Sequence, residues 1–185
     1  YMLEGALMAV TALAILAALR WSELPSLGRS VQLGAIVGLG LLTKQTVVLA
    51  LAVPLAWVMR DRFRSHFPMV IAAIAIAGAI VGPWWWVNGQ QQLAYLGTSA
   101  SGQGGGDVWS HAMFYPQSLW WVGLGPVLAL AAVVAGWQGR GSRGWMLAMA
   151  WLVGGLIVLL LIPKKYPRLM APLLPAVAVM AVSAW

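Results

Sequence analysis

The residue best suited to chemistry in this sequence is Lys44, an ammonium group set between two short apolar stretches. The stretches 31–42 and 47–59 flank the polar run Thr-Lys-Gln-Thr at 43–46. Each stretch makes only about 20 Å of helix, against about 30 Å of hydrocarbon in a bilayer. Charges at such a break are costly and tend to line the path of a substrate. Lys44 is therefore predicted to face an anionic headgroup, with an ordinary lysine at an extracellular turn as the alternative.

A second group of cations lies in the densest charged segment, Pro-Lys-Lys-Tyr-Pro-Arg at 163–168. Lys164 and Lys165 offer point charges, and Arg168 offers a guanidinium fork that can bind phosphate oxygens in bidentate fashion. These three residues are predicted, with Lys44, to bind a phosphate group. A basic anchor against lipid headgroups is the alternative.

The remaining polar residues of interest are an acid at the start of the chain and a small set in the loops. Glu4 precedes an apolar stretch and is either a solvated boundary charge or one carboxylate of a site. Asp107 and His111 lie four residues apart, and would share a face of a helix. A metal site needs more ligands than this, and the chain has no cysteine, so neither a metal nor another cofactor is expected.

The elements that must position these residues are apolar helices. Of 185 residues, 62% are hydrophobic and only 8% are charged, with mean hydropathy +0.85, whereas soluble domains carry about 25% charged residues. No stretch alternates as barrel strands do. The sequence thus predicts an all-α, polytopic transmembrane bundle with about six to seven spans, and membrane lipids rather than nucleic acid as the partners of its net charge of +7.

The organisation expected is one transmembrane domain over 1–185, with a long outer loop at about 88–118. Because the chain starts at Tyr1 and stops inside an apolar stretch, it is interpreted as an internal fragment truncated at both ends. The prolines at 172 and 175 interrupt the last apolar stretch near its start. The other apolar stretches expected to cross the membrane are 5–19, 68–87, 119–137 and 145–162.

The distribution of Lys and Arg indicates an orientation. If Glu4 lies outside, seven of the eleven basic residues fall on the cytoplasmic side, which positive-inside topology favours. The four that fall outside are Lys44, Lys164, Lys165 and Arg168, and an anionic ligand on the outer face would supply their counter-charge. The chain is therefore expected in a bacterial inner or plasma membrane, with its site facing outside.

Three motifs together resemble a known family. Gly-Leu-Gly-Leu-Leu-Thr-Lys at 38–44, Gly-Pro-Trp-Trp at 82–85 and Tyr-Pro-Arg-Leu-Met-Ala-Pro-Leu-Leu-Pro at 166–175 resemble, in order and spacing, the polyprenyl-phosphate-dependent glycosyltransferases of the GT-C fold. The nearest members in character are the protein mannosyltransferases and lipid A aminoarabinose transferases, glycosyltransferase family 39.

The resemblance implies a membrane enzyme that moves a sugar from a polyprenyl-phosphate donor to a lipid, glycan or protein acceptor outside the cytoplasm. Lys44 and Arg168 fall on family positions expected to neutralise the carrier phosphate, and Glu4 matches an acidic position. The family's main catalytic carboxylate is expected upstream of this chain, so the catalytic residue is not assigned, with Glu4 as one candidate, and the fragment alone is expected to be inactive. The resemblance further implies that Asp107, His111 and Tyr166 contact the acceptor.

Two other readings remain open. Helices broken at a charge are also typical of secondary transporters, which would further predict an inverted repeat and polar residues inside several spans. A non-catalytic, lipid-binding membrane subunit would use the same basic residues only to hold a headgroup.

Overall fold

The computed structural model describes residues 2–100, 108–118, 125, 133–134, 137–138, 141–160 and 167–182. Every regular element in these ranges is a helix, and none is a strand, which confirms the all-α prediction. The chain forms two compact units, Tyr1–Leu93 and Ala94–Trp185, which are described separately. The expectation of a single domain stays a prediction.

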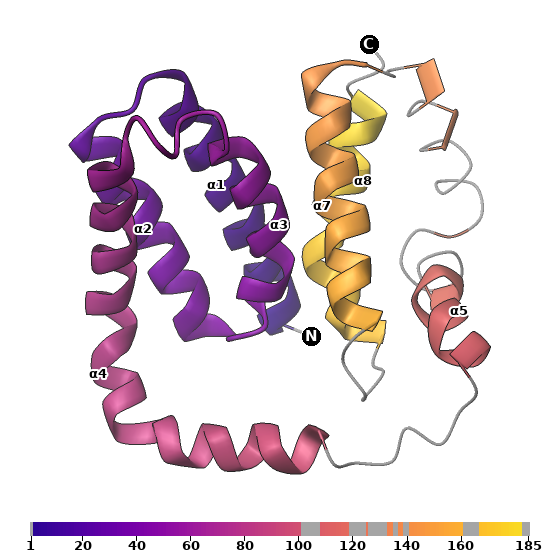
Figure 1. Cartoon of the computed structure of the whole chain (residues 1–185). Helices are drawn as coiled ribbons and strands as arrows, with labels where there is room; N and C mark the ends of the chain where they lie inside the picture. Colours follow the sequence, from indigo (N-terminus) through magenta and orange to yellow (C-terminus); the bar gives the residue numbers. More distant parts are fainter. Residues whose placement is uncertain are drawn as a thin grey trace. The chain divides into compact units, whose positions relative to one another are not determined.

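The first unit is a set of helices that run back and forth, joined by short connections (Figure 1). Residues 24–26, 44–46 and 60–66 form these connections, and α4 packs against α2. α1 contacts both α2 and α3. The elements are α1 (Met2–Glu23), α2 (Leu27–Thr43), α3 (Val47–Met59) and the first part of α4 (Phe67–Ala100).

α1 carries the core of this unit on one stripe. Leu7, Ala14, Ala18 and Trp21 are fully buried, and their spacings of seven, four and three residues place them on one face of a helix. Thr11 lies on the same face, where its hydroxyl donates to the carbonyl oxygen of Leu7 at 2.9 Å. The hydroxyl is thereby satisfied within the helix, so it adds little cost to the apolar stripe.

α2 approaches α4 closely through two glycines. A Cβ at Gly34 would lie 2.3 Å from the carbonyl oxygen of Ala73, and one at Gly38 would lie 3.2 Å from the Cα of Ala77. Small residues four apart on both helices let their backbones touch, which is a common basis of helix packing in membranes. The position of α4 against α2 therefore depends on the absence of side chains at these two glycines.

α4 is longer than the expected span and bends sharply along its length (Figure 1). Pro83 lies inside it and removes one helical hydrogen bond. Beyond the bend the helix continues to Ala100, and α5 (Val108–Ser118) follows. The stretch 88–118 was expected to be a loop; both of its ends are helical. Glutamine and alanine favour helix in the first of these ends, and the densest run of glycines is at 102–106.

The second unit is organised around α7 (Arg143–Leu160). This helix contacts α5, the 3₁₀ helix η2 (Pro167–Leu173) and α8 (Leu174–Val182). A Cβ at Gly155 of α7 would meet the side chain of Leu173, so η2 packs against a gap in the α7 surface. Pro172 lies within η2, and the regular helix begins only after it, which confirms that the last apolar stretch is interrupted near its start.

Three helices are long and apolar enough to cross a membrane: Glu4–Glu23, Phe67–Ala94 and Arg143–Leu160. Three further apolar helices are shorter, namely Leu27–Thr43, Val47–Met59 and Leu169–Met180. The two short arms predicted around Lys44 are thus confirmed. Most of the expected span 119–137 lies outside the described residues, and the total of six to seven spans stays a prediction.

Candidate functional site

Lys44 stands at the break between α2 and α3, as its sequence neighbours predict. Its backbone is extended, with φ −164° and ψ 123°, and its N–H donates to the carbonyl oxygen of Gly40 at the end of α2. The Thr43 hydroxyl donates to the same oxygen at 2.7 Å. Lys44 is half-buried, so its ammonium group is neither fully solvated nor enclosed.

α3 begins directly after this break. The N–H groups of Val47 and Val48 donate to the carbonyl oxygens of Lys44 and Gln45, at 3.0 and 3.2 Å. The start of a helix carries the positive end of its dipole, and the end of α2 favours a nearby cation for the complementary reason. For the Lys44 cation the two helix ends act in opposite directions, while for an anion the Lys44 charge and the start of α3 are both favourable.

The Thr46 hydroxyl is the notable polar atom of the break. Thr46 is the residue before α3, yet its side chain makes no capping hydrogen bond. The hydroxyl oxygen is buried, and it has no hydrogen-bond partner among the described residues. Because a buried polar atom without a partner is costly, this hydroxyl beside Lys44 is suited to bind an oxygen of a ligand.

α1 reaches the break because Gly40 has no side chain. A Cβ at that position would lie 2.6 Å from the side chain of Val10. The crossing brings the first turn of α1, which carries Glu4, to the Lys44 end of the unit. The Glu4 carboxylate lies within range of a weak Coulombic attraction to Lys44. Glu4 is half-buried.

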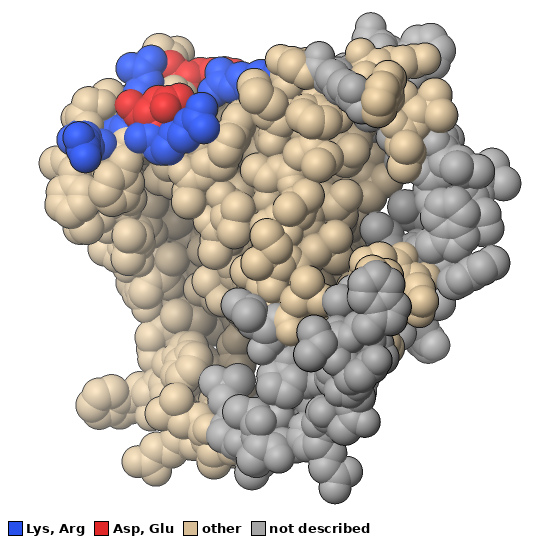
Figure 2. All heavy atoms as spheres, turned by 45° about the vertical axis from the view of Figure 1, so that its right-hand side comes forward, with Lys and Arg blue, Asp and Glu red and all other residues tan. Residues whose placement is uncertain are grey.

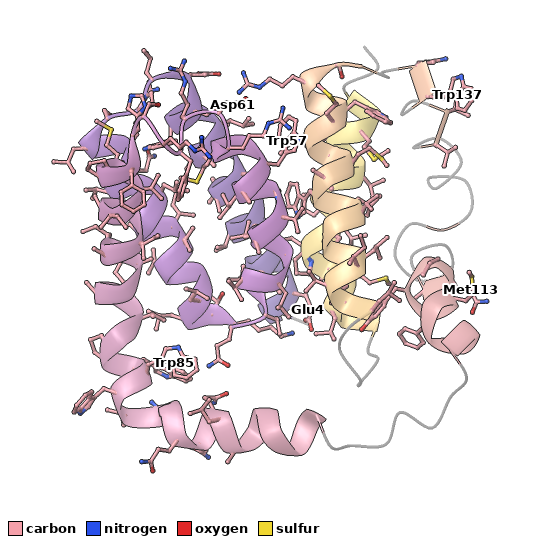
Figure 3. All side chains as sticks on the ribbon, viewed as in Figure 1. Glu4, Trp57, Asp61, Trp85, Met113 and Trp137 are labelled. Atoms are coloured by element: carbon pink, nitrogen blue, oxygen red, sulfur yellow. The ribbon has the colours of Figure 1, made fainter. Side chains whose placement is uncertain are left out.

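α4 adds aromatic side chains at the same end. Figure 3 places Glu4 and Trp85 at the end of the first unit opposite to Trp57 and Asp61. The rings of Trp84 and Trp85 meet edge to face, with centroids 6.1 Å apart. The side-chain amide of Asn88 donates to the Trp84 carbonyl oxygen at 3.0 Å, which satisfies one backbone group near the bend.

The chemistry that this end offers is the binding of an anion by one ammonium, one hydroxyl and a helix start, with one carboxylate nearby. Of the carboxylates in the described ranges, Glu4 alone shares this end, because Glu23 and Asp61 lie in or beside the opposite connections. No three His, Cys, Asp or Glu of the described residues come together as metal ligands.

The other predicted site residues lie outside the described residues or in the second unit. Lys164, Lys165, Tyr166 and Asp107 lie outside the described residues. The backbone places Arg168 in η2 and His111 in α5, both in the second unit. Sequence reasoning did identify Lys44 and Glu4, but it did not single out the Thr46 hydroxyl; the threonine directly before an apolar helix was the available signal.

Comparison with protein-family models, with curated proteins and with solved structures found no match to this chain.

Proposed function

We propose that this chain belongs to a glycosyltransferase of the GT-C fold, which moves a sugar from a polyprenyl-phosphate carrier to a lipid, glycan or protein acceptor. In this proposal the chain is an internal fragment of a helix bundle with about six to seven spans. The bundle lies in a bacterial inner or plasma membrane, with the Lys44 end outside the cytoplasm.

The outer surface of the first unit supports the membrane location. Large apolar side chains on three of its helices are strongly exposed: Leu13 is 50% exposed, Leu39 is 54% exposed and Ile74 is 62% exposed. One of these helices, α2, ends at the break at Lys44. A protein surface of this kind is stable against lipid chains and unfavourable in water, so we infer that lipid covers it.

The distribution of charge supports the orientation. Five arginines lie in or beside the connections 24–26 and 60–66, whereas Lys44 is the one basic residue at the opposite end of the first unit. An excess of arginine marks the cytoplasmic side of a membrane protein. The Lys44 end then faces outside, where lipid-linked sugars would be used.

The single observation that carries the proposal is the break between α2 and α3, which holds the half-buried residue Lys44 and the buried, unpartnered Thr46 hydroxyl. In the proposed reaction the bond between the sugar carbon and the carrier phosphate breaks, and a bond from an acceptor oxygen to that carbon forms. Negative charge develops on the departing phosphate, so cations fixed beside it stabilise the transition state more than the ground state. Lys44 would supply that charge, and Lys164, Lys165 and Arg168 would add to it.

The acceptor hydroxyl must lose its proton as it attacks, and a carboxylate is a suitable base. The resemblance places the family's main carboxylate upstream of this chain. Glu4 is the described carboxylate nearest to Lys44, so we assign it a supporting role, in which its charge orients the Lys44 ammonium towards the phosphate. Asp107, His111 and Tyr166 are assigned to acceptor contacts, and no cofactor is invoked.

The test is transfer of radiolabelled sugar from polyprenyl-phosphate sugars by membranes that contain the full-length protein. Lys44→Ala should lower the transfer rate by about a hundredfold, the size typical of removing one charged group that stabilises a transition state. Lys44→Arg should keep most of the rate. The matched control is Arg64→Gln, which removes one exposed cation at the opposite end and should leave the rate unchanged.

The outcomes separate the alternatives. Loss of transfer in Lys44→Ala, at equal protein level, supports the enzyme. If no carrier gives transfer but the protein moves solutes across vesicles, the secondary transporter is correct. If it binds polyprenyl phosphate without either activity, it is a lipid-binding subunit.

A further inference from the structure

The end of the first unit opposite to Lys44 carries most of its charge. Figure 2 shows Lys, Arg, Asp and Glu side chains gathered on one end of the molecule, with uncharged surface below them. The last turn of α1 and the connection 60–66 meet at this end, since the Trp21 ring lies edge to face with the His66 ring at a centroid distance of 6.3 Å. We call this end the arginine surface; its charged residues are Arg20, Glu23, Arg29, Arg60, Asp61, Arg62 and Arg64.

Two of the five arginines are engaged within the protein. The Arg29 guanidinium donates to the carbonyl oxygens of Arg20 and Leu24, the latter at 3.1 Å, and so closes the C-terminal end of α1. Arg60 donates to Asp61 at 3.2 Å and lies over the Trp57 ring, 5.1 Å from its centroid. These contacts hold the two connections in place and satisfy part of their charge.

The other three arginines are available to a ligand. Arg20, Arg62 and Arg64 are exposed, and their guanidinium groups make no hydrogen bond or ion pair within the described ranges. Five arginines against two carboxylates leave the surface with a net charge of +3 when His66 is neutral. The positive-inside rule explains the excess of arginine on this side of the membrane. It does not explain why aromatic residues lie beside these arginines.

Two exposed phenylalanines lie beside the arginines, Phe63 in the connection 60–66 and Phe67 at the start of α4. Phe63 is 44% exposed and Phe67 is 48% exposed, and their rings meet edge to face with centroids 5.6 Å apart. Phe63 stands between Arg62 and Arg64 in the sequence. Guanidinium groups bind phosphate oxygens, while apolar rings at the membrane boundary enter the edge of the acyl region.

We propose that the arginine surface binds the phosphate groups of anionic phospholipids, with Arg62 and Arg64 on the phosphate and Phe63 and Phe67 at the acyl boundary. Charge complementarity favours an anionic leaflet, and the apolar exposed side chains on the adjoining helices place this surface at the height of the headgroups. The proposal requires a membrane location but no sugar transfer, so its failure and the failure of the glycosyltransferase assignment are distinguishable.

The test is native mass spectrometry of the full chain, purified in a neutral detergent and offered equal amounts of phosphatidylglycerol and phosphatidylcholine. The measured quantity is the ratio of the two lipids retained. One basic residue beside an anionic membrane surface gives about a fivefold preference, so Arg62→Gln/Arg64→Gln should lower the ratio by about 30-fold. Arg62→Lys/Arg64→Lys, which keeps the charge, should retain most of the preference.

A second variant keeps the test decisive if the first fails to fold. Glu23→Gln/Asp61→Asn removes the two carboxylates of the surface and should raise the ratio of anionic to neutral lipid retained. An unchanged ratio in both the arginine and the acid variants overturns the proposal. Displacement of phosphatidylglycerol by an equal concentration of inorganic phosphate also overturns it, because the surface would then bind free anions rather than a lipid.

Discussion

The close approach of α2 and α4 makes a quantitative prediction for Gly34→Ala. The new methyl carbon would lie 2.3 Å from the Ala73 carbonyl oxygen and 3.0 Å from the Ile76 Cβ, so the helices must separate by about 1 Å and lose up to about half of the attraction in their closest contacts. Overpacking of this kind costs about 1–3 kcal/mol. Alanine is favoured over glycine inside a helix by about 0.5–1 kcal/mol, which leaves a net destabilisation of about 1–2 kcal/mol.

Two other glycines provide a graded comparison. A Cβ at Gly38 would meet the Ile80 Cβ at 3.0 Å, and one at Gly78 of α4 would meet nothing within 4 Å. Gly38→Ala should therefore be close to neutral, and Gly78→Ala should stabilise the protein by about 0.5–1 kcal/mol. Thermal unfolding in detergent, followed by tryptophan fluorescence, would give the three shifts in Tm. A Gly34→Ala protein as stable as Gly78→Ala would refute the close packing of α2 on α4.

Three further predictions concern other parts of the first unit. Trp21→Phe should lower stability by about 1–2 kcal/mol, because it removes the buried 2.8 Å hydrogen bond from Trp21 Nε1 to the Ser30 hydroxyl. Trp86→Phe, at a residue that is 92% exposed, is the control for the same melting measurement. Arg29→Ala should lower stability by about 1 kcal/mol by releasing the carbonyl oxygens at the end of α1, and a Tm equal to that of wild type would argue against this cap. Because the chain has no cysteine, Gln45→Cys and Ser65→Cys each introduce a single thiol. A membrane-impermeant maleimide should label position 45 in intact cells and position 65 only after permeabilisation. The reverse labelling pattern would show that the proposed orientation is wrong.

The local features of this fold could be read from the sequence because they depend on neighbouring residues. The break at 43–46 follows from a polar run between two apolar stretches too short to cross a membrane, and the structure has it between α2 and α3. The interruption before α8 follows from prolines that cannot donate a helical hydrogen bond. Both signals lie within a few residues of the feature that they cause.

The features that depend on distant residues could not be read in the same way. Nothing in the sequence near Gly34 indicates that Ala73 is its neighbour. Nothing near Lys44 indicates that Glu4, forty positions earlier in the chain, lies within range of its charge. The helical part of 88–100 was missed because a glutamine-rich segment after a proline suggests a loop, whereas α4 continues through it. Packing between helices decided the first two features, whereas the helix at 88–100 follows from the helix propensity of its own residues.

The central claim of this account is that Lys44 holds the phosphate of a polyprenyl carrier. The most direct measurement is the Kd of the full-length protein for a short-chain polyprenyl phosphate without sugar, compared between wild type, Lys44→Ala and Lys44→Arg. Hydrogen bonds to charged groups contribute about 1.5–3 kcal/mol, so Lys44→Ala should weaken binding at least about tenfold, while Lys44→Arg should bind within a few-fold of wild type. Equal affinity of wild type and Lys44→Ala, with both proteins folded, would contradict the claim.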